Sequence, residues 1–206
     1  MTVKTIRIKN KSSAEPSNER EVRLIIILLS LFASAMIFGA GSINLTNPSS
    51  ETINILEYCL TTKNEISLFR IIFNSFCSNT IPLLLIFLSG FSYIGIPFTI
   101  ALFAIKGLSL GYIAGYLFSV SAKGIGYYLV TILPANTIYF TILIINVLHS
   151  YIMTRDIVLC ISEKKTIQEN ALRNYIIRFL IILILSLTAS LIEGAFTKLY
   201  FYLFSF

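Results

Sequence analysis

Two ionisable residues, Lys106 and Glu193, lie deep inside long apolar runs of the sequence. A charged side chain within hydrocarbon costs about 2.5 to 3.5 kcal/mol unless it finds a partner or reaches the surface. Because the two charges have opposite signs, a salt bridge between them is one interpretation. Counting along each run, however, places Glu193 about 10 Å from the depth of Lys106, since a helix rises 1.5 Å per residue. Separate contacts of each side chain with polar surroundings are therefore an equally good alternative.

A second candidate chemistry is that of an intramembrane serine protease. Residues 107–111 read GLSLG, and a histidine, His149, follows on a later apolar run. A nucleophile elbow needs a strand-to-helix turn, whereas this pentapeptide lies within a helix. Ser109 lies roughly 18 Å into its run, while His149 lies at the end of another. We therefore predict that the chain is not an enzyme and has no catalytic, cofactor-binding or metal-binding residues.

The composition is that of a membrane protein. Of 206 residues, 56% are hydrophobic and only 13% are charged, and the mean hydropathy is +0.82. This leaves too little polar surface to cover a globule in water. The net charge of +6 comes from cations beside apolar runs, where they set topology and contact anionic lipid. We expect membrane lipids as partners and no nucleic acid.

Five apolar segments are long enough to cross a bilayer, because a hydrocarbon core of about 30 Å needs about 20 helical residues. The expected spans are 24–43, 71–91, 97–118, 125–148 and 175–195. They predict an all-α, polytopic helical bundle that forms one membrane domain. For the second span, whose first half is interrupted by Asn74, Ser75, Asn79 and Thr80, a re-entrant or interfacial start is the alternative. The first span resembles a signal peptide, but its length favours an uncleaved helix.

The basic residues predict the orientation, because short cytoplasmic segments carry an excess of lysine and arginine. The tail 1–23 and the loop 149–174 hold most of these residues, so both, and with them the N-terminus, are expected in the cytoplasm. The linker 44–70 and the tail 196–206, and with it the C-terminus, are then extracytoplasmic. A short interfacial helix and an irregular loop are equally good interpretations of the linker. The aromatic residues of the last tail are expected to form a belt at the membrane surface.

Small and polar residues predict how the helices pack. Gly107, Gly111 and Gly115 recur every fourth residue, which lets another backbone approach one helical face closely. Such a face packs equally well within one chain or between two, so a homo-oligomer is an open alternative. The last span has a polar stripe that should point into the bundle. The stripe consists of Ser186, Ser190, Glu193 and Thr197.

Proline and glycine mark two irregular points. Gly90, Gly95 and Pro97 bracket a tight hairpin between the second and third spans. Pro134 removes a backbone donor from the fourth span and should kink it. The side chain of Asn136 or its neighbour Thr137 is then expected to bond to the carbonyls that are set free.

Five short motifs occur along the chain in a recognisable order. They are Phe38 to Ala40, the set Gly90, Ser92, Ile94, Gly95 and Pro97, the run Lys106 to Phe118, Leu133 to Asn136, and Ile192 to Gly194. Together with the length and the five spans, they resemble the stage II sporulation protein M family. The resemblance implies an endospore-forming bacterium and a multi-pass protein of its cell membrane. It also implies a location on the mother-cell side of the sporulation septum and of the engulfing membrane.

The resemblance further implies a non-enzymatic scaffold. In this family the protein anchors and localises peptidoglycan-degrading partners, the stage II sporulation proteins D and P, at the septum for wall thinning and forespore engulfment. The alternative is a transporter or permease-like membrane subunit that works with a cytoplasmic ATPase. The small number of ionisable residues within the spans and the lack of a visible internal repeat favour the scaffold.

Overall fold

The computed structural model describes residues 17–46, 67–120, 122–162 and 169–203. Within these ranges the chain is helical except for one short turn, and it contains no strand. The helices are α1 (Ser17–Thr46), α3 (Leu68–Ser89), α4 (Gly95–Val120), α5 (Ala122–Tyr127), the π-helical turn η1 (Tyr128–Ile132), α6 (Leu133–Ser162) and α7 (Glu169–Leu203).

Five helical stretches are long and apolar enough to cross a membrane. They are Val22–Ile43, Leu68–Ser89, Gly95–Ser119, Gly124–Ser162 and Asn170–Leu203. The prediction of an all-α polytopic bundle with five spans is therefore confirmed. The second span is one continuous helix, so its polar residues do not interrupt it.

The last two helices extend beyond the boundaries expected from hydropathy. α6 continues to Ser162 and α7 runs to Leu203, so much of the expected loop 149–174 and of the tail 196–206 is helical. Hydropathy marks where the chain leaves the hydrocarbon, whereas a helix needs only its backbone hydrogen bonds, which also form in water. The interfacial helix considered for the linker 44–70 and most of the basic tail 1–23 lie outside the described residues.

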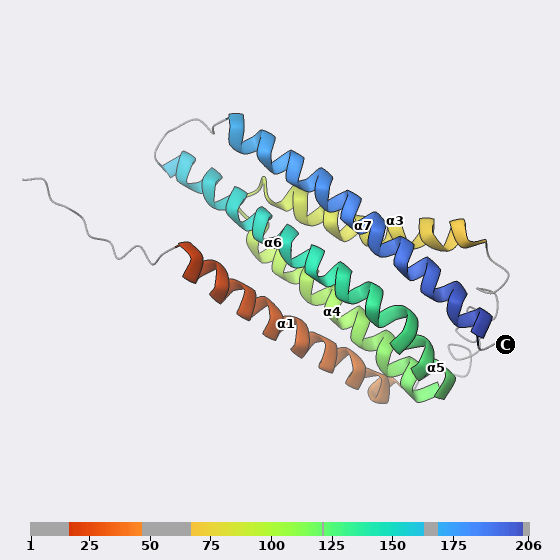
Figure 1. The fold of residues 1–206 in the computed structure, drawn as a ribbon. Coiled ribbons are helices and arrows are strands. Elements are labelled where there is room, and N and C mark those ends of the chain that lie inside the picture. The colour runs from red at the N-terminus through yellow and green to blue at the C-terminus, as the bar shows by residue number, and fades with distance from the viewer. Residues whose placement is uncertain (1–16, 47–66, 121, 163–168, 204–206) are drawn as a thin grey trace, which may run out of the picture.

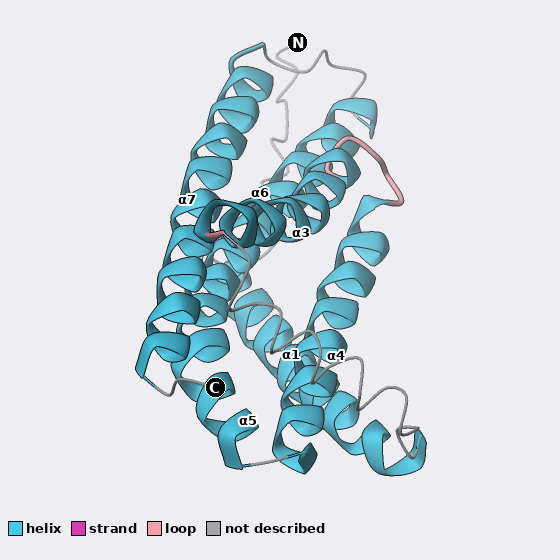
Figure 2. Cartoon of the chain, turned by 90° about the vertical axis from the view of Figure 1, so that its right-hand side faces the viewer, coloured by secondary structure: helices cyan, strands magenta, loops and turns pink. Residues whose placement is uncertain are grey.

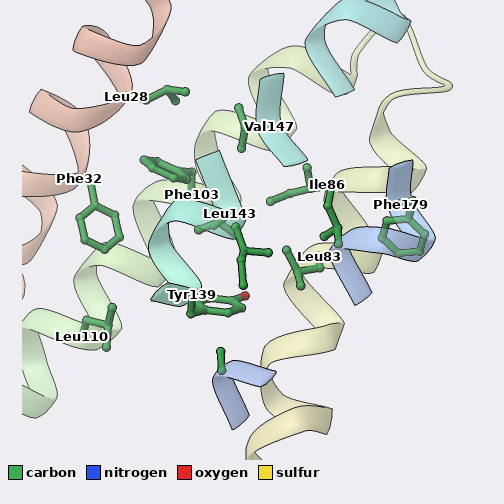
Figure 3. Close-up of a cluster of buried hydrophobic side chains, with 13 residues drawn as sticks. Leu28, Phe32, Leu83, Ile86, Phe103, Leu110, Tyr139, Leu143, Val147 and Phe179 are labelled. Carbon is green, nitrogen blue, oxygen red and sulfur yellow. The ribbon is translucent and has the colours of Figure 1, made fainter. Parts of the chain in front are cut away.

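The helices form a core of four with a fifth at the edge. α3 and α6 contact each other, and each also contacts α4 and α7, whereas α1 packs chiefly on α4 and only slightly on α6 (Figure 1). The turn between α3 and α4 lies at one end of the bundle and α5 at the other (Figure 2). A cluster of buried apolar side chains, including Phe32 of α1, Phe103 of α4 and Leu83 of α3, fills the interior (Figure 3).

The hairpin between α3 and α4 is built by short backbone bonds and two glycines. The amide of Ser92 donates to the Ser89 carbonyl, and that of Gly95 to the Ser92 carbonyl, each at 3.0 Å. A β-carbon at Gly95 would overlap the Ser89 carbonyl, and one at Gly90 would overlap the hydroxyl of Tyr175. Pro97 lies in the first turn of α4, where its missing donor is not needed.

The glycine face of α4 packs against α1 of the same chain. A β-carbon at Gly111 would overlap the carbonyl oxygen of Met36, and one at Gly115 would lie 2.9 Å from that of Ala40. Gly107 meets α1 in the same way, with Ala35 only 3.1 Å from such an atom. The two backbones are therefore in direct contact. This is the close approach that small residues permit between membrane helices.

We expect Gly111→Ala to lower the free energy of unfolding by about 1 to 3 kcal/mol, because the added methyl group must displace a backbone carbonyl. The larger Gly111→Leu should abolish assembly of the bundle. Gly41→Ala is the matched control, since nothing lies within 4 Å of the added atom on the outer face of α1. Unfolding transitions in detergent measure the effect. Equal transitions for Gly111→Ala and Gly41→Ala would contradict the packing of this face.

Candidate functional site

A chain of hydrogen bonds connects the two ionisable residues of the bundle interior. The ammonium of Lys106 donates to the side-chain oxygen of Asn79 at 3.3 Å, and the Asn79 amide donates to the Ser75 hydroxyl at 3.4 Å. That hydroxyl donates to the carboxylate of Glu193 at 2.5 Å. Among the ion pairs of the described residues, none joins Lys106 directly to Glu193. We call these four residues the polar chain.

Helix α3 spans the difference in depth within the bundle between Lys106 and Glu193. Ser75 and Asn79 lie one turn apart on α3, which separates them by about 6 Å along the helix axis. Asn79 thus meets α4 at the level of Lys106, while Ser75 meets α7 at the level of Glu193. The direct salt bridge considered from the sequence is therefore replaced by a connection through two neutral side chains.

Tyr139 of α6 completes the surroundings of Lys106. The ammonium lies 4.9 Å from the centre of the Tyr139 ring, which is within the range of a cation–π contact. The Tyr139 hydroxyl donates at 2.9 Å to the backbone carbonyl of Asn79. Figure 3 shows this ring within the buried cluster, directed from α6 toward α3. The polar chain is therefore held by α3, α4, α6 and α7 together.

The polar stripe of α7 points into the bundle, as its spacing predicts. Ser186, Ser190 and Thr197 are fully buried, and Glu193 is half-buried. Ser190 and Thr197 donate to carbonyls of their own helix. The Ser186 hydroxyl is buried without a hydrogen-bond partner among the described residues.

Side chains of α6 and α7 also bind the backbone of α3. Four carbonyls of α3 and of the residue that follows it accept hydrogen bonds in this way. The pairs are Tyr139 to Asn79 at 2.9 Å, Asn146 to Leu83 at 2.9 Å, Tyr175 to Phe87 at 2.8 Å and Thr154 to Gly90 at 3.2 Å. Since hydrocarbon offers no water to buried polar groups, these donors must find partners inside the protein. They fix α3 against α6 and α7.

The irregular point in the fourth span combines a π-helical turn with proline. η1 ends two residues before Pro134, and the wider turn makes room for the proline ring. Asn136 donates its side-chain amide to the Ile132 carbonyl at 2.9 Å, and Thr137 bonds the next carbonyl at 2.8 Å. Both side chains therefore bond to backbone beside the irregularity.

Ser109 and His149 are in separate surroundings. The Ser109 hydroxyl donates to a carbonyl of its own helix, that of Ile105, at 3.0 Å. Ser109 borders a depression between α4 and α1, while His149 borders a cavity between α6 and α7. The structure therefore does not bring these two residues together as a catalytic pair.

The aromatic residues at the end of α7 differ in part from the sequence prediction. Tyr200 and Phe201 are buried and pack against Tyr127 of α5, with ring centres 5.4 and 5.9 Å apart, whereas Tyr202 is 84% exposed. The expectation of a belt at the membrane surface is wrong for the first two. Their rings close the end of the bundle, because aromatic edges and faces attract one another.

Sequence reasoning missed Ser75, Asn79, Tyr139 and Tyr175 as members of the site. The first two were visible only as polar interruptions of an apolar run. Their four-residue spacing was the signal that they share a helical face. The two tyrosines gave no signal, because an aromatic residue in an apolar run most often only fills space.

A bundle of five membrane-length helices whose interior polar groups bond to one another defines a polytopic integral membrane protein. The family model described as stage II sporulation protein M matches residues 27–198. The chain therefore belongs to the stage II sporulation protein M family and is a membrane protein of sporulation. No match was found among curated proteins or among solved structures.

We expect Lys106→Met and Glu193→Gln to destabilise the bundle less together than the sum of their separate effects. The coupling should be about 0.5 to 1.5 kcal/mol, because residues of one hydrogen-bond network do not act independently. Unfolding free energies in detergent give this double-mutant cycle. Thr188→Ala serves as the control partner for Lys106→Met, since Thr188 is exposed and bonds only to its own helix. Additivity for Lys106 and Glu193 would disprove the polar chain.

Tyr139→Phe and Tyr175→Phe should each lower the free energy of unfolding by about 0.6 kcal/mol and by no more than about 1.7 kcal/mol, the mean and the maximum for hydrogen bonds between membrane helices. Each change removes only the hydroxyl that bonds to α3. Tyr93→Phe should have no effect, because Tyr93 is 73% exposed in the hairpin. The same unfolding assay compares all three. A loss for Tyr93→Phe as large as the others would show that the α3 contacts are unimportant.

Proposed function

We propose that this protein is a non-enzymatic scaffold of the engulfment machinery. It anchors the peptidoglycan-degrading partners, the stage II sporulation proteins D and P, at the septum for wall thinning and forespore engulfment. Membership of the stage II sporulation protein M family is the observation that carries this proposal. The function is placement of other catalysts in the membrane.

The division of the residues between the helical bundle and its short connecting segments supports a scaffold. The internal segments that connect the described helices are short, and the longest, 47–66, has about 20 residues. Chains below about 40 residues generally need disulfides, metals or partners to fold on their own. The described helices themselves pack into one bundle. Cleavage of the cell wall would therefore be the work of partner proteins.

The two ends of the bundle differ in the number of arginine residues. The end formed by the start of α1, the end of α6 and the start of α7 carries Arg23, Arg155, Arg173 and Arg178. Among the described side chains, the other end carries Arg70 and Lys198. The excess of arginine supports a cytoplasmic location for the first end, with the N-terminus inside and the linker 44–70 outside. In this orientation the linker faces the wall on which the partners act.

Helix α1 offers a long surface to a partner within the membrane. It packs chiefly on α4, and its outer face carries large exposed side chains such as Ile26, Ile37 and Phe38. The membrane segment of a partner can pack there while the opposite face of α1 holds the glycines of α4. This face and the linker that follows α1 are the proposed recruitment surfaces.

Cells that lack the protein are expected to keep a thick septal wall and to stop membrane migration during sporulation. The full-length chain should restore both, whereas Gly111→Leu should not and Gly41→Ala should. Detergent pull-downs of the full-length chain should also recover protein P. Normal engulfment without the protein would disprove the role, and failure to recover protein P would disprove the scaffold mechanism. Solute flux in proteoliposomes would instead support a permease-like subunit.

A further inference from the structure

A separate cavity of about 230 Å³ lies between the end of α6 and the start of α7. Its wall contains charged groups of both signs, Asp156 from α6 and Arg178 from α7, together with His149. None of these residues belongs to the polar chain. The cavity is therefore a distinct polar site at one end of the bundle.

The cavity lies at the level where lipid headgroups are expected. Arg155 and Asp156 are the first charged residues that α6 reaches after its apolar stretch. Arg173 and Arg178 are the last charged residues of α7 before its apolar stretch begins. Charged side chains at such positions mark the edge of the hydrocarbon. The apolar side chains of Ile177 and Ile181, both exposed on α7, extend from this edge into the membrane.

Polar groups of the cavity are available to a ligand. Arg178 is exposed and has no hydrogen-bond or ion-pair partner among the described residues. The Nδ1 atom of His149 is buried, so this residue contributes to the wall of the cavity and does not contact a ligand through that atom. Asp156 is bonded at one oxygen, by its exposed neighbour Arg155 at 3.3 Å. Such a surface pair is weak, and the second oxygen of Asp156 is open to another donor. The Tyr175 hydroxyl is bonded to α3, so its ring serves as a wall.

We propose that this cavity binds the headgroup of a phospholipid that carries both a phosphate and a primary ammonium, the chemistry of phosphatidylethanolamine. Arg178 donates to the phosphate, and Asp156 accepts from the ammonium. The acyl chains then follow the exposed apolar side chains of α7. A phosphatidylglycerol headgroup offers Asp156 no positive charge, and a choline headgroup has no N–H to donate. The mixed charges of the wall therefore select one class of lipid.

The test is native mass spectrometry of the full-length protein in neutral detergent. Phosphatidylethanolamine, phosphatidylglycerol and phosphatidylcholine with identical acyl chains are titrated separately. We expect one phosphatidylethanolamine to be retained with at least about tenfold higher affinity than the other two, since each loses a charge-assisted contact. Arg178→Gln and Asp156→Asn should each reduce this affinity about tenfold. Arg173→Gln is the matched control, because Arg173 is exposed on the same helix and does not line the cavity.

Three results would overturn the proposal. The first is equal retention of all three lipids, and the second is a preference for phosphatidylglycerol that Asp156→Asn leaves unchanged. The third is an equal response of Arg178→Gln and Arg173→Gln. The unfolding transition of each variant, measured in lipid-free detergent, separates loss of the site from loss of the fold. If Arg178→Gln has a lowered unfolding transition, Asp156→Asn alone tests the site. Unchanged affinity for phosphatidylethanolamine in Asp156→Asn then counts against the proposal.

Discussion

The need of α3 for polar partners inside the membrane determines the arrangement of the bundle. Lipid is as apolar as a leucine side chain, so burial of apolar surface does little to bring membrane helices together. Polar groups, in contrast, must be satisfied within the protein. α3 carries Ser75 and Asn79 and presents several of its carbonyls to other helices. Because the partners come from α4, α6 and α7, α3 must contact all three.

Helix α4 joins two parts of the bundle by two kinds of contact. Lys106 bonds to α3, while the next residue, Gly107, lies against α1. Successive residues of a helix point roughly 100° apart, so one helix can serve both neighbours at the same depth. On one side the contact is a hydrogen bond, and on the other it is the direct approach of two backbones. If α4 did not present separate faces to α3 and to α1, α1 would have little connection to the other helices.

The sequence predicts the parts of this structure that depend on one segment at a time. Apolar length identified the five spans, and the spacing of Gly107, Gly111 and Gly115 identified a face for close packing. The sequence could not identify which helix packs on that face, because α1 is distant from α4 along the chain. The same limit explains why the sequence left a direct salt bridge of Lys106 with Glu193 open. The connection through Asn79 exists only because α3 lies between the other two helices.

The contact between α1 and α4 has a consequence for how the protein is made. The ribosome must pass from Thr46 to Gly95, and complete all of α3, before the first residue of α4 exists. Until then the small side chains of α1 around Gly39 lack the α4 backbone on which they pack, although α1 has already been made. Helix α1 therefore waits in the bilayer for its main partner, although it can dock on α4 before α6 and α7 have been made.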